Sequence, residues 1–129
     1  MLFTKCILSE PVPEDGLRIS IMSRHTLNDG KTPDVRIKHF HRHLPSFGPS
    51  PNLIGRYYRK EISWDVFERN YLEQLRAPLK ARAVKKFAML ALFADITVLC
   101  IEQSADHCHR RLFAEECQRH ESELVVEHR

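Results

Sequence analysis

The chain has 129 residues, of which 43% are hydrophobic and 29% are charged, so its composition is that of one ordinary globular domain. Its formal net charge of +3 permits an anionic partner without requiring one. Glycine occurs only four times, and neither GxxxxGKS/T nor GxGxxG is present, which excludes the common glycine-rich phosphate loops.

Apolar stretches are short throughout the chain. The N-terminal run MLFTKCILSE is too short and too interrupted for a signal peptide. The longest apolar stretch, FAMLALFADITVLCI, is broken by Asp95 and is shorter than a membrane span. We therefore expect a soluble cytoplasmic protein with no membrane partner, whose four cysteines are thiols rather than disulfides.

The first part of the chain predicts two strands and a long irregular connection. Residues 2–8 form a short apolar run, and residues 17–22 alternate apolar and polar side chains as a strand does. The segment 23–55 is polar and turn-rich, and its stretch 45–52 contains three prolines, which excludes a helix or a central strand there. Long connections in a small domain are often functional.

Two helices are predicted next. Ser63 can cap the first, whose apolar stripe consists of Trp64, Phe67, Tyr71, Leu72 and Leu75. Pro78 fits the first turn of the second helix, whose buried face consists of Leu79, Ala83, Phe87, Leu90 and Ala91. Both stripes are interpreted as core.

The last third predicts a strand, a helix and a strand. ITVLCI (96–101) is the β-branched run of a strand covered on both faces, a helix follows over about 105–119, and LVVEH (124–128) is a further strand. Together with the earlier elements, this predicts a single α/β domain over 1–129. Its sheet should be small and mainly parallel, with helices flanking it.

Cysteine, histidine and arginine cluster where the strand 96–101 leads into the helix. Ligands of parallel sheets bind beyond the carboxyl ends of the strands, and Cys100 lies at such an end. With Ser104 or Asp106 as N-cap, the segment His107–Cys108–His109 enters the first turn, where free N–H groups and the helix dipole attract anions. The segment therefore predicts an anion-binding pocket, which Arg110 and Arg111 would reinforce.

The same field would lower the pKa of the Cys108 thiol, so Cys108 is the candidate nucleophile and His107 or His109 the candidate acid or base. Cys108 is equally compatible with a small buried residue, because it leans toward the sheet near Cys100. Arg24 follows the strand 17–22 and would face the same rim if the two strands are parallel.

Two other interpretations remain open. Cys100, His107, Cys108 and His109 are acceptable zinc ligands, but their spacing is not that of a known zinc motif, so we expect neither a metal nor a cofactor. The basic segment VRIKHFHRHL (35–44), with His39, His41 and His43 at alternate positions, is compatible with a histidine metal site, a nucleic-acid patch or a solvated surface. The sequence does not indicate an oligomeric state.

Three segments carry a family resemblance: VPEDGLRISIMSRHTLNDG (12–30), SWDVFERNYLEQL (63–75) and ITVLCIEQSADHCHRRLFAEEC (96–117). In this order, and with H-C-H-R at 107–110, the chain resembles the domain-of-unknown-function family that includes YeaO-like proteins. The resemblance implies a compact α/β fold and an arginine at Arg24, but no established reaction. Ser23 stands where that family usually has Asp.

Overall fold

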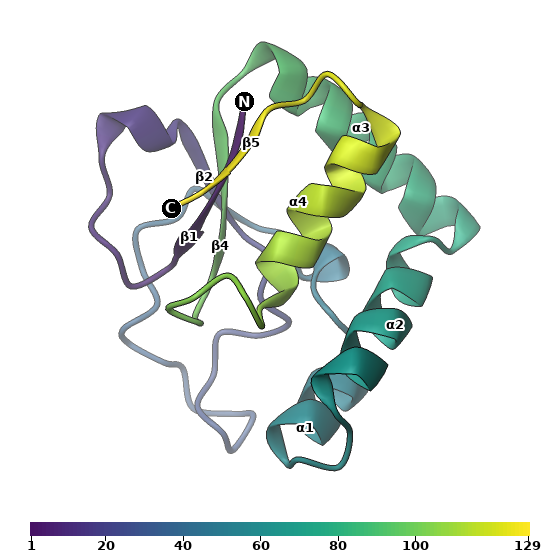
Figure 1. Cartoon of the computed structure of the whole chain (residues 1–129). Coiled ribbons are helices and arrows are strands. Elements are labelled where there is room, and N and C mark those ends of the chain that lie inside the picture. Colours follow the sequence, from purple (N-terminus) through teal and green to yellow (C-terminus); the bar gives the residue numbers. More distant parts are fainter.

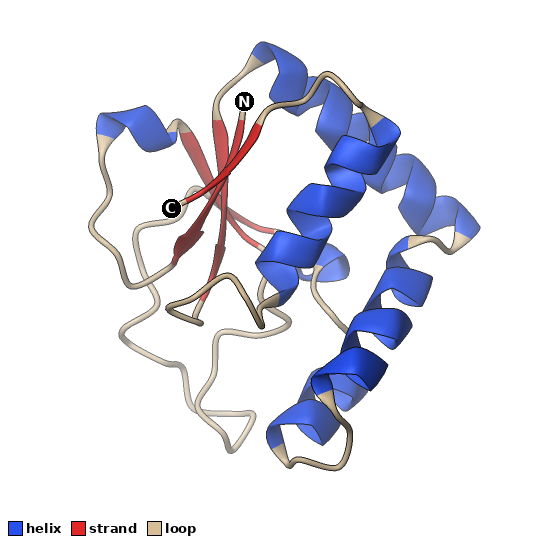
Figure 2. Cartoon of the chain, viewed as in Figure 1, coloured by secondary structure: helices blue, strands red, loops and turns tan.

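A computed structural model describes residues 1–129, and its centre is a five-stranded, all-parallel sheet in the order β3-β2-β4-β1-β5 (Figures 1 and 2). The strands are β1 (Leu2–Cys6), β2 (Leu17–Ser20), β3 (Arg42–His43), β4 (Ile96–Cys100) and β5 (Val126–His128). The helices are α1 (Pro51–Tyr58), α2 (Trp64–Leu75), α3 (Pro78–Phe93) and α4 (His109–His120), with short 3-10 turns η1 (Pro13–Asp15) and η2 (Pro45–Phe47). The predicted α/β class and parallel sheet are confirmed.

Strand β4 is the central strand, and every one of its residues is buried. Its side chains alternate between the two faces of the sheet, as the pleat requires. Ile96 and Val98 join the main core, whereas Leu99 packs with Ile7 and Ile37 in a small cluster on the other face. Cys100 has the same parity as Ile96 and Val98 and therefore faces the main core.

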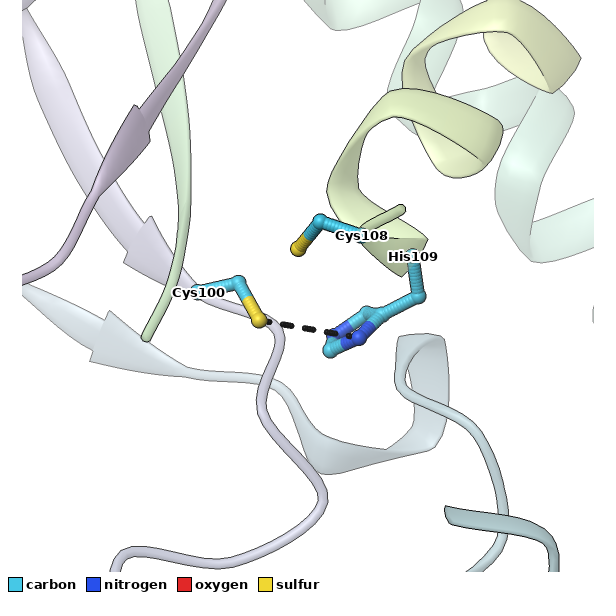
Figure 3. Close-up of side chains that lie close together, drawn as sticks. All are labelled: Cys100, Cys108 and His109. Carbon is cyan, nitrogen blue, oxygen red and sulfur yellow. Dashed lines mark hydrogen bonds between the residues drawn. The ribbon is translucent and has the colours of Figure 1, made fainter. Parts of the chain in front are cut away.

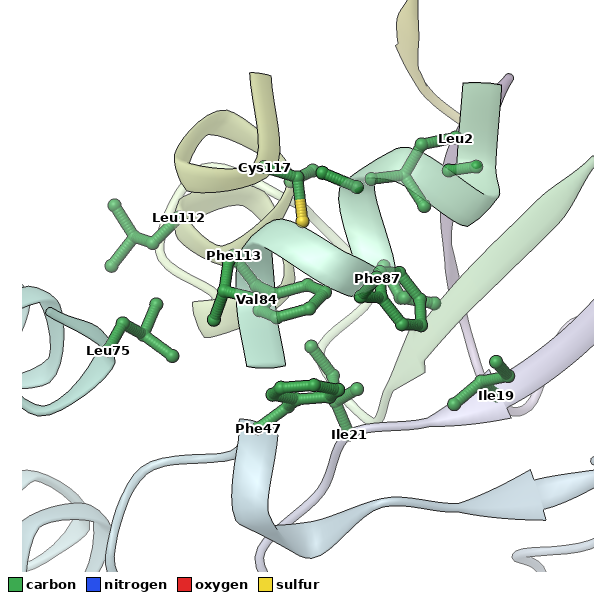
Figure 4. Close-up of a cluster of buried hydrophobic side chains, with 14 of the residues drawn as sticks. Leu2, Ile19, Ile21, Phe47, Leu75, Val84, Phe87, Leu112, Phe113 and Cys117 are labelled. Atoms are coloured by element: carbon green, nitrogen blue, oxygen red, sulfur yellow. The ribbon is translucent and has the colours of Figure 1, made fainter. Parts of the chain in front are cut away.

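The four helices cover one face of the sheet, and irregular chain covers much of the other (Figure 1). Between the sheet and the helices lies a cluster of buried side chains in which Phe113 of α4 contacts Phe47 and Phe87 (Figure 4). Each such fully buried aromatic side chain contributes roughly 1.5–3 kcal/mol to stability. No helix combines the length and the apolarity that crossing a bilayer would require.

The helix starts follow local rules except at α4. Ser50 and Ser63 accept a hydrogen bond from the first turns of α1 and α2, and Pro78 occupies the first turn of α3 as predicted. For α4 the prediction is wrong: the N-cap is Cys108, not Ser104 or Asp106, and the helix begins at His109.

The late start of α4 has a tertiary cause. The Arg110 guanidinium donates to the backbone carbonyls of Glu102 and Gln103, which holds residues 101–108 in an irregular loop. Local capping preferences cannot anticipate a contact of this kind. We refer to residues 101–108 as the β4–α4 loop.

Strands β2 and β4 are neighbours whose onward connections run in opposite directions. From β2 the chain continues to the adjacent β3, and from β4 it continues through α4 to β5, two strands away on the other side. A crevice forms at such a switch point, outside the carboxyl ends of the two strands. The parallel pairing of β2 with β4 places the chain after Ser20 and the chain after Leu99 at this same edge.

Candidate functional site: a cysteine–histidine pair at the sheet edge

Cys100 and His109 meet at the carboxyl end of β4. The Cys100 Sγ lies 3.6 Å from the His109 Nδ1, and both side chains are almost completely buried (Figure 3). Cys100 comes from the strand end and His109 from the first residue of α4, so the β4–α4 loop brings the two residues together. A thiol and an imidazole within hydrogen-bond distance are the arrangement that a cysteine nucleophile and its base require.

A backbone carbonyl orients the imidazole. The His109 Nε2–H donates to the carbonyl oxygen of Ile21, at 2.9 Å, just beyond the end of β2. Because this bond fixes the proton on Nε2 in the neutral ring, Nδ1 carries the free lone pair that faces Cys100. Burial lowers the pKa of His109, so the ring is neutral at pH 7 and its Nδ1 is free to accept a proton.

Arg110 is a fully buried arginine with no carboxylate partner. Its guanidinium donates to two loop carbonyls and approaches the Cys108 Sγ at 3.4 Å, while its Nε has no hydrogen-bond partner. A buried charge without a counter-charge costs several kcal/mol, by the usual order of magnitude. Of the groups that the guanidinium contacts, only the Cys108 thiol can acquire a negative charge.

The pKa values of the Cys100 and Cys108 thiols are shifted in opposite directions. Burial would raise the pKa of Cys100, but hydrogen bonds from Cys108 and from the Glu102 N–H, with the Arg110 charge, lower it overall. Burial and the hydrogen bond to Cys100 raise the pKa of Cys108 well above its ordinary value. The expected lowering of the Cys108 pKa is therefore wrong, because the thiol is buried at the N-cap of α4.

A cavity of about 710 Å³ opens above the pair. It is lined by Cys100 and His109 from one side and by residues after β2, including Arg24, from the other. The expectation that Arg24 and the cysteine–histidine segment share one rim is confirmed, because β2 and β4 are parallel. Arg24 forms no ion pair, so its guanidinium is available to a ligand in the cavity.

A tyrosine–glutamate pair forms another part of the cavity wall. The Tyr58 hydroxyl on α1 donates to the Glu102 carboxylate at 2.7 Å, and both residues line the cavity. Burial and this hydrogen bond raise the pKa of Tyr58, so the phenol stays protonated. The cavity lining therefore contains two arginines, Arg24 and Arg36, of which Arg36 pairs with Asp34. It also contains the carboxylates of Asp29 and of Glu102, the latter hydrogen-bonded to Tyr58.

Two predicted site residues lie apart from the pair. His107 stacks on Trp64 of α2, with ring centroids 4.8 Å apart, and Arg111 forms an ion pair with Glu115 at 2.9 Å on the exposed side of α4. Since the helix begins at His109, neither side chain occupies the cavity lining. The structure thus brings together Arg24, Cys100, Cys108, His109 and Arg110, and it leaves His107 and Arg111 outside.

The basic segment 35–44 is mostly irregular. Only Arg42–His43 forms a strand, and His39 has a positive φ of 62°, so the three histidines do not alternate along one strand. His41 accepts a hydrogen bond from the Arg18 N–H, and His43 stacks on His25. The three histidines are not part of a group of ligand atoms that converge closely enough to share a metal ion.

Sequence reasoning did not single out three contributors. The Ile21 carbonyl is a backbone group, so no residue type could reveal it. Tyr58 and Glu102 meet only through the packing of α1 against the β4–α4 loop. The position of Glu102, two residues after the cysteine that ends a strand, could have indicated that it lies at the site.

These features define a class of protein: a parallel α/β domain with a cysteine–histidine pair and a buried arginine at a topological switch point. The chain belongs to the DUF488-N3a family, whose model, described as "Active DUF488-N3 subclade", matches residues 2–121. This confirms the expected membership of a family of unknown function, and the YeaO-like name is compatible with it. Neither the curated proteins nor the solved structures include a match to the chain.

Proposed function

We propose that the protein is a thiol-dependent enzyme in which Cys100 is the nucleophile and His109 the general base. The observation that carries the proposal is the chain of contacts from the Cys100 Sγ to the His109 Nδ1 and from the His109 Nε2 to the Ile21 carbonyl. Nucleophile, base and orienting group are the three parts of a catalytic triad. The proposed nucleophile is therefore Cys100 and not Cys108, which the sequence favoured.

The charges around Cys100 support this assignment. Arg110 places a permanent positive charge against the Cys108 Sγ, and the Cys100 pKa is lowered in this environment. In the proposed reaction the thiolate attacks an electrophilic carbon or phosphorus atom and forms a covalent S-linked intermediate. The leaving group takes the proton that His109 removed from Cys100, and water then releases the product.

The substrate proposed for this site carries a phosphate or carboxylate group. Arg24 is unpaired at the cavity rim, and a guanidinium binds either anion with two parallel hydrogen bonds. The cavity volume of about 710 Å³ is in the range that accepts a small molecule. His107 and Arg111, which lie outside the cavity, have no direct role in this proposal.

The proposal is tested by alkylation with iodoacetamide between pH 5 and 9, with each cysteine followed by peptide mass spectrometry. We expect Cys100 to react faster than Cys6 at pH 7, and its rate to fall when His109 is replaced by Gln. Chromogenic nitrophenyl esters and phosphates then test turnover, and Arg24→Gln should raise KM more than it lowers kcat. Equal labelling of Cys100 and Cys6 at every pH would refute the nucleophile assignment.

A bound zinc ion is the second candidate. The ligand atoms of Cys100, Cys108 and His109 all lie within 4.8 Å of one another, which is close enough for a shared metal after small adjustments. The Arg110 guanidinium, 3.4 Å from the Cys108 Sγ, opposes a second cation there. Near-stoichiometric zinc in the purified protein, lost in Cys108→Ser, would favour the metal site over the thiol enzyme.

A further inference from the structure

Cys108 gives the site a second sulfur that the proposed reaction does not consume. We propose that Cys100 and Cys108 form a reversible disulfide when a hydroperoxide enters the cavity, so that the pair is a site of peroxide reduction. The two Sγ atoms belong to a group whose ligand atoms all lie within 4.8 Å of one another, and both side chains point into the same space (Figure 3). This inference shares Cys100 with the proposed function but does not depend on hydrolysis.

The backbone between the two cysteines is compatible with a closer approach. Cys100 ends β4, Cys108 is the N-cap of α4, and the intervening loop contains no helix or strand. The loop is held chiefly by hydrogen bonds from Arg110 and by the stacking of His107 on Trp64. Joining the sulfurs therefore needs adjustment of an irregular segment and not of the sheet.

The roles of the two thiols are unequal. Cys100 lines the cavity, whereas Cys108 does not, so a hydroperoxide in the cavity meets Cys100 first. His109 Nδ1, 3.6 Å from the Cys100 Sγ, can accept the thiol proton, and the resulting thiolate is the form that peroxides oxidise. Cys108 stays protonated until its partner has reacted.

The chemistry balances in two steps. The Cys100 thiolate attacks one oxygen of the hydroperoxide, the O–O bond breaks, and an alkoxide or hydroxide leaves and is protonated, which gives Cys100 sulfenic acid. The Cys108 sulfur then attacks the Cys100 sulfur, the S–O bond breaks, and water leaves as the disulfide forms. Two electrons pass from the two thiols to the hydroperoxide.

The remaining cysteines are poorer partners. Cys117 is buried in the main core among apolar side chains. Cys6 pairs in register with Cys100 across β1 and β4, but its Sγ donates to the Ile101 carbonyl and it lies outside the close group of ligand atoms. Cys6 is therefore the competing partner that an experiment must exclude.

The charge of Arg110 should shift the equilibrium between the two thiols and the Cys100–Cys108 disulfide. A disulfide carries no charge, so its formation removes the thiolate that balances the buried guanidinium. An environment that stabilises the reduced thiolate makes the disulfide a stronger oxidant. We therefore expect the disulfide to be reduced readily by a small thiol such as glutathione.

The test treats the full chain with stoichiometric hydrogen peroxide and maps disulfides by peptide mass spectrometry without reduction. We expect a Cys100–Cys108 link that glutathione reverses, and the same link in the matched control Cys6→Ser. Cys108→Ser should stop at the sulfenic acid, which dimedone traps at Cys100. A Cys6–Cys100 link, or over-oxidation of Cys100 in the wild-type chain without a disulfide, would overturn the inference.

The same variants separate this inference from the proposed function. If Cys108→Ser still alkylates rapidly at Cys100 but the wild-type chain forms no disulfide, only the peroxide inference fails. If Cys100 is unreactive toward both iodoacetamide and peroxide, both proposals fail. Cys108→Ala provides a second variant should the serine hydroxyl prevent folding at this buried position.

Discussion

The protein buries two clusters of charge at the sheet, and only one of them contains a carboxylate. Asp15 is fully buried and accepts hydrogen bonds from Lys5 and from Arg18, with Thr97 bonded to its backbone carbonyl. Burial would raise the pKa of Asp15, but the Val12 N–H and the two cationic side chains lower it overall. Arg110 is equally buried and forms no ion pair with a carboxylate; its guanidinium contacts two backbone carbonyls and the Cys108 thiol.

The comparison suggests different roles for the two clusters: the Asp15 cluster stabilises the fold, and Arg110 belongs to the proposed reactive site. In the Asp15 cluster the opposite charges are built into the side chains and persist at every pH near neutrality. The Arg110 guanidinium contacts two carbonyls and the Cys108 thiol, so a contacting group becomes negative only if that thiol loses its proton. In the function proposed above, the role of this cation is to stabilise a reactive thiolate.

The largest expected effect is the loss of the carboxylate from the paired cluster. Asp15→Asn leaves the cations of Lys5 and Arg18 buried without a counter-charge, and breaking a buried pair costs about 3–5 kcal/mol. Urea unfolding at pH 7 measures the change in the free energy of unfolding. Glu123→Gln, at an exposed position, is the matched control and should change it by less than about 0.5 kcal/mol. A small loss in Asp15→Asn would contradict a structural role for this cluster.

Removal of the unpaired cation should affect reactivity more than stability. Arg110→Met leaves the carbonyls of Glu102 and Gln103 without their donor, at a cost of about 1–3 kcal/mol, but it also removes an uncompensated charge. We expect the Cys100 pKa to rise, with a tenfold lower alkylation rate below that pKa for each unit gained. Stopped-flow alkylation across pH measures this rise.

Arg110→Lys sharpens the same prediction, because it keeps the charge and loses the forked geometry. It should retain part of the alkylation rate that Arg110→Met loses. If the two variants react alike, hydrogen-bond geometry rather than charge determines the Cys100 pKa.

The dependence of stability on pH is a smaller effect. Because the Cys100 pKa is lowered in the folded state, the thiol binds fewer protons there than in the unfolded chain. Between the folded pKa and the unfolded pKa of about 8.5, the free energy of unfolding should rise by up to about 1.4 kcal/mol per pH unit. As pH falls through the folded pKa this contribution is lost.

Above pH 8.5 the slope should reverse, because Cys108 and Cys117 have raised pKa values and keep their protons when folded. The difference in unfolding free energy between the wild type and Cys100→Ser, measured in urea from pH 6 to 9, isolates the rising part. A difference independent of pH would show that folding leaves the Cys100 pKa unchanged.

The smallest expected effect concerns the pKa of His25, a histidine that can lose its proton and become neutral. Burial, with the charge of the stacked His43, lowers the pKa of His25 to about 4, so this ring is neutral at pH 7. Arg110, in contrast, keeps its charge although it is buried. His43→Gln should raise the His25 pKa above 4 while burial keeps it below 6.5. NMR titration measures the shift, and His120→Gln on α4 serves as the control that should leave it unchanged.

The sequence predicts much of this fold because its signals are local. ITVLCI is a continuous β-branched run, and it forms the fully buried central strand, while Ser63 and Pro78 start α2 and α3 as expected. The sharing of one rim by Arg24 and Cys100 could also be predicted, because parallel strands align their carboxyl ends.

The assignment of the reactive thiol could not be predicted. Helix-dipole reasoning favours Cys108, but the start of α4 depends on contacts that Arg110 makes with the β4–α4 loop. The lowered Cys100 pKa depends on Cys108, on a backbone N–H and on Arg110, which only the folded chain gathers. Such tertiary contacts override local rules most often at functional sites.

The stacking of His107 on Trp64 has a practical consequence. Trp64 is the only tryptophan, so all indole fluorescence originates where α2 contacts the β4–α4 loop. A shift of this loop, whether by ligand entry or by joining of the cysteines, separates the two rings and alters the emission. The native chain thus carries an intrinsic optical reporter of its own loop, which label-free stopped-flow measurements can read.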